Sequence, residues 1–289
     1  MTHENFSPLR YPGGKGKLSQ YVARTILDNN LKGCEYVEPF VGGGAVALYL
    51  LQKGFVRHIH INDIDPAIYS FWKHAVYNTQ ELISLVETTP VTIDEWKKQR
   101  NIQRNKENFV GTLDLAFSTL FLNRTNRSGI LWAGPIGGQK QDGAWKLDCR
   151  FNKERIRKQL NSLAAFRENI SIYRLDAREL IEEVGERKGQ FFFYIDPPYY
   201  LKGQSLYLNS FTHLDHLKLS QIIKKLPANW LVSYDNVSEI ANLYNDCGKV
   251  EYGIQYSVQR KYEGREVIFY PLHQAVPHTQ EPAKYRLNF

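Results

Sequence analysis

One short segment of this 289-residue chain carries residues that can hold an amino group on a flat ring. Five large apolar or aromatic residues, 191–195, run directly into Asp196-Pro197-Pro198-Tyr199. The carboxylate of Asp196 and the carbonyl of Pro197 can each accept a hydrogen bond from an exocyclic amine, and the ring of Tyr199 can stack on the heterocycle. A lone Asp-Pro pair would more simply end a strand in a turn. The complete segment favours the amine-binding interpretation.

The apolar run that precedes Asp196 must position this carboxylate. Such an unbroken run predicts a central strand of a parallel sheet, buried on both faces. The two prolines end the strand because proline cannot donate a hydrogen bond to the ladder. Open α/β sheets bind ligands just outside the carboxyl ends of their strands, so the sequence predicts a ligand site beside Asp196.

The segment Asp196-Pro197-Pro198-Tyr199 resembles the (Asp/Asn/Ser)-Pro-Pro-(Tyr/Phe/Trp) motif of the amino-methyltransferases that act on nucleic acid bases. In that family an Asp in first place implies transfer to N6 of adenine. The resemblance therefore implies that these four residues form the catalytic motif and that S-adenosyl-L-methionine is the methyl donor. Because this donor is already activated, no metal is expected.

A glycine-rich turn earlier in the chain fits a bound cofactor. Residues 35–41 predict a strand, and Gly42-Gly43-Gly44 opens a predicted helix over 45–51. The spacing Gly42-x-Gly44-x-x-Ala47 satisfies the dinucleotide-binding fingerprint in its Gly/Ala form, in which backbone N–H groups come close to a ligand. A tight strand–helix turn would need the same glycines for packing alone.

A second predicted strand, residues 57–62, ends at Asp63, about twenty residues beyond the glycines, where an acid holds a ribose hydroxyl in dinucleotide-binding folds. Asp63 and Asp65 have two other interpretations, a helix cap before Pro66 or a divalent-metal pair, and capping or ribose binding is favoured over metal. NAD and S-adenosylmethionine both contain adenosine, so these elements do not choose between them. The segment that begins at Asp196 favours S-adenosylmethionine over NAD, because hydride transfer from a nicotinamide does not require an amine-binding group.

The opening segment, Tyr11-Pro12-Gly13-Gly14-Lys15, is glycine-rich and basic but lacks the spacing of a phosphate-binding P-loop. It resembles the first motif of Dam-type DNA adenine methyltransferases, in which an aromatic residue, two glycines and a lysine hold the methionine end of the cofactor. Asp176, just beyond a predicted strand, faces the cofactor's adenine in the family, and a helix N-cap is its equally weighted alternative. The cofactor-binding residues that the resemblance implies are Tyr11, Lys15, Glu38, Phe40, Gly42, Gly44, Asp63, Asp176 and Asp196.

Between about Phe71 and Asn169 the alternation of strands and helices lapses. Within this stretch, residues 117–138 are rich in Asn, Arg, Gly and Trp, and we expect a long functional loop that is not core material. Arg can contact guanine edges and Asn adenine edges. The Leu-Asn-Arg piece resembles the DNA-contacting loop of Dam-like enzymes, although residues 125–127 depart from the aromatic-containing version of GATC-methylating members, which leaves target specificity open. The implied DNA-binding residues are Asn123, Arg124, Asn126 and Arg127.

Charge and composition also bear on partners. The net charge of +7 favours a polyanion, and the basic run over 146–158 suits phosphate contacts or, equally, a solvated helix face. The three cysteines are scattered without metal-ligand spacing, and the N-terminus lacks a secretory pattern, so we expect a cytoplasmic setting. No apolar run approaches the ~18–20 residues of a membrane span. The expected partner is double-stranded DNA, with a separately acting restriction endonuclease as an open second partner.

The predicted fold is α/β, with a Rossmann-like class I methyltransferase sheet that ends in an antiparallel hairpin over 250–270, plus a mainly helical insert. Residues 1–70 and 170–289 are predicted to form the S-adenosylmethionine-binding catalytic domain. Residues 71–169 are predicted to form the inserted target-recognition domain.

The order of the motifs along the chain resembles that of the Dam-like D12 class, the alpha group of amino-methyltransferases. This resemblance implies a site-specific enzyme that methylates N6 of an adenine flipped out of duplex DNA. Two alternatives remain open on the sequence alone. One is methylation of RNA adenine N6 or of cytosine N4, and the other is a nucleic-acid binder that keeps a relic cofactor pocket.

Overall fold

The computed structural model describes residues 6–10, 15–201, 211–256, 262–279 and 281–287. Contacts within the chain define two compact units. We call residues 1–14, 42–45 and 63–174 the helical unit, and residues 15–41, 46–62 and 175–289 the sheet unit.

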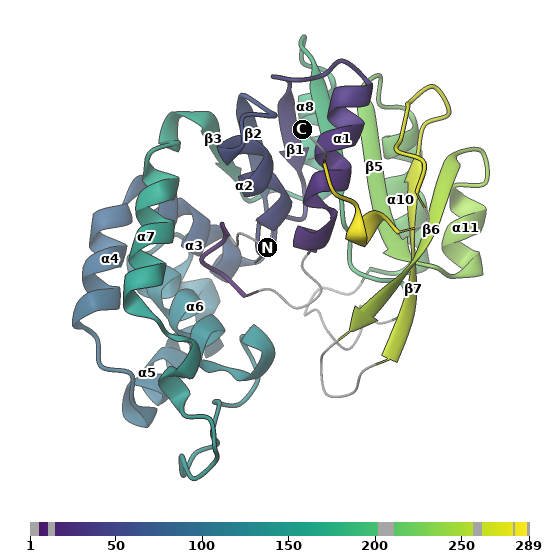
Figure 1. The fold of residues 1–289 in the computed structure, drawn as a ribbon. Coiled ribbons are helices and arrows are strands. Elements are labelled where there is room, and N and C mark those ends of the chain that lie inside the picture. Colours follow the sequence, from purple (N-terminus) through teal and green to yellow (C-terminus); the bar gives the residue numbers. More distant parts are fainter. Residues whose placement is uncertain (1–5, 11–14, 202–210, 257–261, 280, 288–289) are drawn as a thin grey trace. The chain divides into compact units, whose positions relative to one another are not determined.

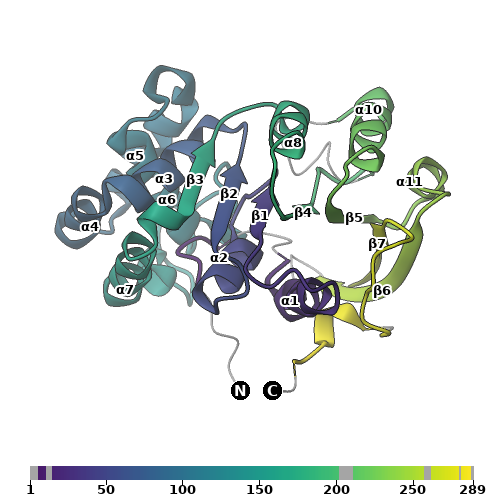
Figure 2. The same ribbon diagram turned by 90° about the horizontal axis from the view of Figure 1, so that it is seen from above.

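Among its described residues, the sheet unit contains six strands in the order β2-β1-β4-β5-β7-β6 (Figures 1 and 2). β1 pairs in parallel with β2 and β4, and β4 pairs in parallel with β5. β7 runs antiparallel to β5 and forms a hairpin with β6. The strands are β1 (Glu35–Glu38), β2 (His58–Asn62), β4 (Phe191–Ile195), β5 (Asn229–Asp235), β6 (Gly248–Tyr256) and β7 (Tyr262–Tyr270).

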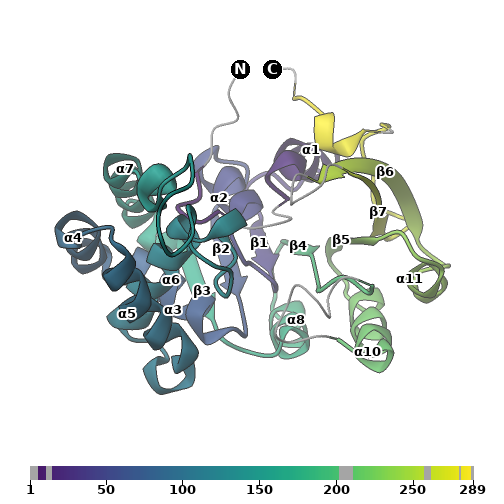
Figure 3. The ribbon, with the colours of Figure 1, turned by 90° about the horizontal axis from the view of Figure 1, so that it is seen from below.

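Helices cover both faces of this sheet. In Figures 2 and 3, α1 (Ser19–Asp28) and α2 (Ala45–Gln52) lie on one face, and α8 (Ala177–Gly185), α10 (His213–Lys224) and α11 (Ser238–Leu243) lie on the other. α10 begins with a capping box, in which Thr212 and Asp215 each accept a hydrogen bond from the other's backbone N–H. The predicted α/β class, the parallel central strands and the C-terminal antiparallel hairpin are confirmed.

The strand register brings one set of residues to the carboxyl edge of the parallel strands. β4 is buried along its whole length, as its apolar sequence predicts, and Asp196 follows it directly. Glu38 ends the neighbouring β1, where Pro39 stops the pairing earlier than the predicted limit at Val41. Because β7 runs antiparallel to β5, Glu266 in the middle of β7 lies opposite Asp235, the last residue of β5.

The helical unit is built from α3 (Pro66–Tyr77), α4 (Thr79–Thr88), α5 (Ile93–Arg104), α6 (Leu113–Thr125) and α7 (Lys153–Ala164), with the strand β3 (Ile170–Tyr173). α6 packs against α3, α4 and α5, and all its residues from Leu115 to Thr125 are buried. A helix that is covered on all sides in this way forms the centre of its unit.

The expectation that residues 117–138 form a loop outside the core is wrong for their first part. Residues 117–125 belong to α6, which begins at an N-cap where Thr112 accepts a hydrogen bond from the N–H of Leu115. The polar residues at the end of α6 can be buried because carbonyl groups of other segments accept their hydrogens.

The predicted insert, residues 71–169, lies within the helical unit, whose longest segment runs from Asp63 to Arg174. The assignment of target recognition to the insert stays a prediction. Within the described residues, no helix combines the length and the apolar character needed to cross a membrane.

Candidate active site

Asp196 is held at the end of β4 through one of its two carboxylate oxygens. Oδ1 accepts a hydrogen bond from the Ser233 hydroxyl at 2.7 Å and lies 3.3 Å from the Lys15 ammonium. Among the described residues, none donates a hydrogen bond to Oδ2, and 22% of the side chain is exposed. Burial raises the pKa of Asp196, against the opposing effects of Lys15 and Ser233. One oxygen is therefore anchored while the other has acceptor capacity left.

Lys15 is buried between two carboxylates. Its ammonium lies 3.3 Å from Asp196 Oδ1 and 3.4 Å from Glu266 Oε1. Burial alone would lower the pKa of Lys15, but the two carboxylates together raise it above its ordinary value. In this structure the ammonium is thus paired with carboxylates of the protein. Its predicted contact with the methionine end of a cofactor stays a prediction.

The Tyr199 ring is buried and held at its hydroxyl end. The hydroxyl donates a hydrogen bond to Glu266 and accepts one from Lys15. The Lys15 ammonium also lies 4.6 Å from the centre of the Tyr199 ring, within the range of a cation–π interaction. The backbone after the motif is fixed by Asp235, whose two carboxylate oxygens accept hydrogen bonds from the N–H groups of Tyr200 and Leu201.

Glu38 lies near Asp196 at the same edge of the sheet. Its Oε2 accepts hydrogen bonds from the Tyr36 hydroxyl at 3.0 Å and from the backbone N–H of Ala47, in the first turn of α2, at 3.2 Å. Burial, with a smaller contribution from the Asp196 charge, raises the pKa of Glu38 to about 8. The neighbouring Phe40 is half-buried and packs edge-to-face on Phe211 at 5.8 Å.

The raised pKa of Glu38 predicts a pH dependence of stability. The folded protein keeps the Glu38 proton up to about pH 8, whereas the unfolded chain loses it near 4.5, so the free energy of unfolding falls as pH rises between these values. The slope from this one group is at most about 1.4 kcal/mol per pH unit. We expect Glu38→Gln to remove that part of the slope in urea unfolding from pH 4.5 to 8.5. The exposed Glu182→Gln should keep the wild-type slope, and an unchanged slope in Glu38→Gln would contradict the assignment.

The glycine turn belongs to the helical unit. Gly42 and Gly44 have φ values of +44° and +60°, a backbone conformation that favours glycine. The N–H of Gly42 donates to Asp63 Oδ2 at 3.1 Å, and the indole of Trp72 donates to the Gly42 carbonyl at 3.0 Å. These two contacts hold the turn in place.

Asp63 and Asp65 have different structural roles. Asp65 caps α3 by accepting a hydrogen bond from the N–H of Ala67 at 2.8 Å, which confirms its interpretation as a helix cap. Asp65 also forms an ion pair with Lys106. Asp63 accepts from the N–H of Asp65, and burial beside the Asp65 charge raises the pKa of Asp63 to about 7. Ribose binding by Asp63 stays a prediction.

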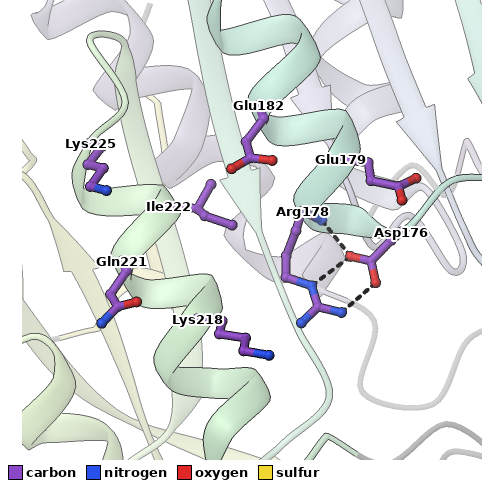
Figure 4. A pocket seen from close by; sticks show the side chains of 8 residues that line it. All are labelled: Asp176, Arg178, Glu179, Glu182, Lys218, Gln221, Ile222 and Lys225. Carbon is purple, nitrogen blue, oxygen red and sulfur yellow. Dashed lines mark hydrogen bonds and ion pairs between the residues drawn. The ribbon is translucent and has the colours of Figure 1, made fainter.

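Asp176 caps α8, as one of its two interpretations requires. Its Oδ1 accepts from the N–H of Arg178 at 2.9 Å, and its two oxygens form a bidentate pair with the Arg178 guanidinium (Figure 4). Arg178 also reaches Asp215 at 3.3 Å, and its hydrogen bonds lower the pKa of Asp176. A contact with the cofactor's adenine stays a prediction, since most of the acceptor capacity of Asp176 is used by Arg178. Tyr11, another predicted cofactor residue, lies outside the described residues.

Three of the four predicted DNA-binding residues are buried inside the helical unit. Asn123 bonds to both backbone groups of Arg10 and to the Gly129 carbonyl. Arg124 donates to the Pro8 carbonyl, and burial lowers its pKa to about 10. Asn126 accepts from the Trp96 indole at 2.6 Å and donates to two loop carbonyls. The fourth residue, Arg127, is exposed. DNA contact stays a prediction for all four residues. Burial disfavours direct contact of Asn123, Arg124 and Asn126 with bases in this conformation.

The hydrogen bonds of Asn126 predict its effect on stability. Alanine at this position would leave the Trp96 indole and the carbonyls of Ile130 and Leu131 without their present partner. We expect Asn126→Ala to lower the free energy of unfolding by about 1–3 kcal/mol, measured by chemical denaturation. Arg127→Ala, at the exposed neighbouring position, should change the free energy of unfolding by about 0.5 kcal/mol or less. Equal stabilities of the two variants would contradict this role of Asn126.

The basic run over 146–158 is mostly engaged within the unit. Lys153 donates to the carbonyls of Glu87 and Thr89, Arg157 pairs with Glu87, and Lys158 pairs with Glu154. These contacts favour a solvated helix face for α7 over a dedicated phosphate site.

Sequence patterns did not indicate Ser233 and Glu266, which the structure adds to the surroundings of Asp196. Ser233 lies within β5, between the apolar residues Leu231 and Val232 and the aromatic Tyr234. Glu266 had one usable signal, because it directly precedes the apolar run 267–270, and in an antiparallel strand the residue before such a run lies at the carboxyl edge of the parallel strands.

Comparisons with known proteins agree with the motif. Residues 11–262 match the family model described as D12 class N6 adenine-specific DNA methyltransferase. The chain is similar to the type II methyltransferase M.MjaIII of Methanocaldococcus jannaschii, with 25% identity over 237 residues that cover 75% of this chain and 79% of the relative. The family description favours DNA adenine over the RNA and cytosine-N4 alternatives.

Two solved structures show a distant likeness to this chain. One is described as a candidate RNA methyltransferase of Pyrococcus horikoshii, with 8% identity and a TM-score of 0.43, and the match covers 91% of this chain and 84% of that one. Another is a precorrin 8w decarboxylase of Methanobacterium thermoautotrophicum, with 13% identity, a TM-score of 0.36, and coverage of 86% and 88%. Likenesses this weak carry no conclusion about function.

Proposed function

Because the chain belongs to the D12 class of N6 adenine-specific DNA methyltransferases, we propose that Asp196, Pro197, Pro198 and Tyr199 bind the target adenine for methyl transfer from S-adenosyl-L-methionine. The observation that carries this proposal is the state of Asp196. Oδ1 is anchored by Ser233 and Lys15, while Oδ2 receives no hydrogen bond from a described residue. A carboxylate oxygen with unused acceptor capacity at the end of a central strand suits an amine ligand.

The chemistry requires positioning more than acid–base strength. The N6 lone pair of adenine is delocalised into the ring, which makes the amine a poor nucleophile. Hydrogen bonds from N6–H to Asp196 and to the Pro197 carbonyl direct the amine toward tetrahedral geometry. Positioning of this kind can supply roughly 7–11 kcal/mol of the barrier.

S-adenosylmethionine supplies a methyl group on a positively charged sulfur, which is already activated for transfer. The bond from carbon to sulfur breaks while the bond from carbon to N6 forms, and N6 then loses one proton. The raised pKa of Asp196 makes this carboxylate a suitable acceptor of that proton. The candidate cofactor contacts remain those named from the sequence, Tyr11, Lys15, Glu38, Phe40, Gly42, Gly44, Asp63, Asp176 and Asp196.

The proposed substrate is duplex DNA with the target adenine flipped out of the stack. A base inside a duplex cannot present its N6 amine to a carboxylate at a strand end, so the base must leave the helix. The net charge of +7 supports a polyanionic substrate, and binding should weaken as salt concentration rises. The name of the relative M.MjaIII, a type II methyltransferase, supports the further proposal of a separate cognate restriction endonuclease.

Methyl transfer to defined nucleic acids tests this function directly. The full-length protein is incubated with methyl-tritiated S-adenosylmethionine and one of three substrates: duplex DNA, the same sequence as a single strand, or RNA. We expect label in N6-methyladenine of the duplex and the highest turnover there. Label confined to RNA would overturn the proposed substrate. A rise in fluorescence of 2-aminopurine at the methylated position would report a base that has left the stack of the duplex.

A further inference from the structure

Glu266 contacts two components of the proposed adenine site. It lies on β7, where only 1% of its side chain is exposed. Its Oε1 accepts a hydrogen bond from the Tyr199 hydroxyl and lies 3.4 Å from the Lys15 ammonium. Its Oε2 accepts a hydrogen bond from the Tyr252 hydroxyl at 2.6 Å. A carboxylate buried this deeply persists only where hydrogen bonds and opposite charge compensate its lost hydration.

The charges around Lys15 are unequal in number. One ammonium serves two carboxylates, Asp196 and Glu266, at nearly equal distances of 3.3 and 3.4 Å. If Glu266 were neutral, Lys15 would pair with Asp196 alone, and the ammonium would compete with an amine substrate for the Asp196 carboxylate. Sharing Lys15 leaves Asp196 more strongly basic than a simple ion pair would.

We infer that Glu266 is a positioning residue for methyl transfer: it fixes the ring of Tyr199 through its hydroxyl, and it draws Lys15 partly away from Asp196. This inference rests on the proposed role of Asp196 and Tyr199 in binding the target adenine. Glu266 itself needs no contact with adenine or methyl donor for this role. It acts through the two residues that it holds.

The experiment compares four variants of the full-length enzyme in steady-state methylation of duplex DNA. Glu266→Gln keeps the size of the side chain and removes its charge. Tyr199→Phe removes the hydroxyl that links the ring to Glu266 and keeps the ring. The double variant measures the coupling between the two groups, and the exposed Glu251→Gln removes a carboxylate from the same hairpin without touching the cluster.

We expect Glu266→Gln to lower kcat by about 10- to 100-fold and to change the KM for DNA by about twofold or less, because misorientation affects reaction more than binding. The acidic limb of the kcat–pH profile should move to lower pH, since the Glu266 charge raises the pKa of Asp196. The double variant should lose less activity than the product of the two single losses. Glu251→Gln should match the wild type.

The outcomes separate this inference from the proposed function. Asp196→Ala is measured alongside, and if it stays active, the motif assignment fails and the inference fails with it. If Asp196→Ala is inactive while Glu266→Gln has wild-type kcat and pH profile, only the inference about Glu266 is overturned. Losses that multiply in the double variant would also overturn it, because a merely structural carboxylate predicts independent effects. If Glu266→Gln fails to fold, the Tyr199→Phe variant tests the inference in its place. A wild-type kcat of Tyr199→Phe would overturn the inference.

Discussion

Asp196→Ala is expected to lower methyl transfer to duplex DNA by at least about 10³-fold while the protein remains folded. The alanine removes the oxygen that receives no hydrogen bond from a described residue, and with it the acceptor proposed for the adenine amine. Folding should persist because the variant also removes a carboxylate whose burial is unfavourable, as its raised pKa indicates. The measurement is single-turnover methylation with labelled donor, combined with thermal unfolding.

The Asp196→Asn variant refines this test. The amide keeps one acceptor oxygen of the same shape but lacks the charge, so we expect activity between those of the wild type and Asp196→Ala. Asp246→Ala is the matched control, because Asp246 is exposed in the same unit and pairs only with Lys224 and its neighbour Cys247 among the described residues. Wild-type turnover by Asp196→Ala on a good DNA substrate would refute the motif assignment.

Lys15→Met is expected to lower the free energy of unfolding by about 3–5 kcal/mol near neutral pH. The methionine fills similar space but leaves the buried Glu266 and the partly exposed Asp196 without their shared cation. Uncompensated carboxylates in such a site cost folding free energy as long as they stay ionised. Urea unfolding of the wild type and the variant at several pH values measures this cost.

The pH dependence of the Lys15→Met effect has a definite sign. In the wild type the pKa of Lys15 is raised, so its stabilising contribution is complete below about pH 10.5 and is lost only as pH rises further. Without Lys15, the pKa of Asp196 rises further, and the folded variant takes up protons as pH falls. The deficit relative to the wild type should therefore be largest near neutral pH and shrink toward pH 4. The exposed Lys17→Met is the control, and a deficit independent of pH would contradict this role of Lys15.

These two variants address separate properties of one cluster. Asp196 is predicted to act on the substrate, whereas Lys15 is predicted to make the buried carboxylates tolerable. If both expectations hold, the edge of the sheet carries a compensated charge cluster in which only one oxygen is reserved for a ligand. The Glu266 variants then test whether Glu266 keeps this Asp196 oxygen available to the ligand.

Local sequence was sufficient for the elements that carry the motif. The apolar run over 191–195 became β4 with its predicted limits. The prolines after Asp196 follow the end of β4, and the glycines at 42 and 44 form the turn that leads into α2. These features depend on backbone geometry and on neighbours a few residues away, so a linear pattern contains the required information.

Only the tertiary structure decided which polar side chains surround Asp196 and which side chains near the predicted loop are buried. Lys15 meets Tyr199 across 184 positions and Glu266 across 251, and neither contact leaves a periodic trace in the sequence. Asn123 is buried because Arg10, 113 positions away, supplies both a donor and an acceptor to its amide. The burial of a polar group depends on whether distant segments satisfy its hydrogen bonds, and the chain must fold before those partners are defined.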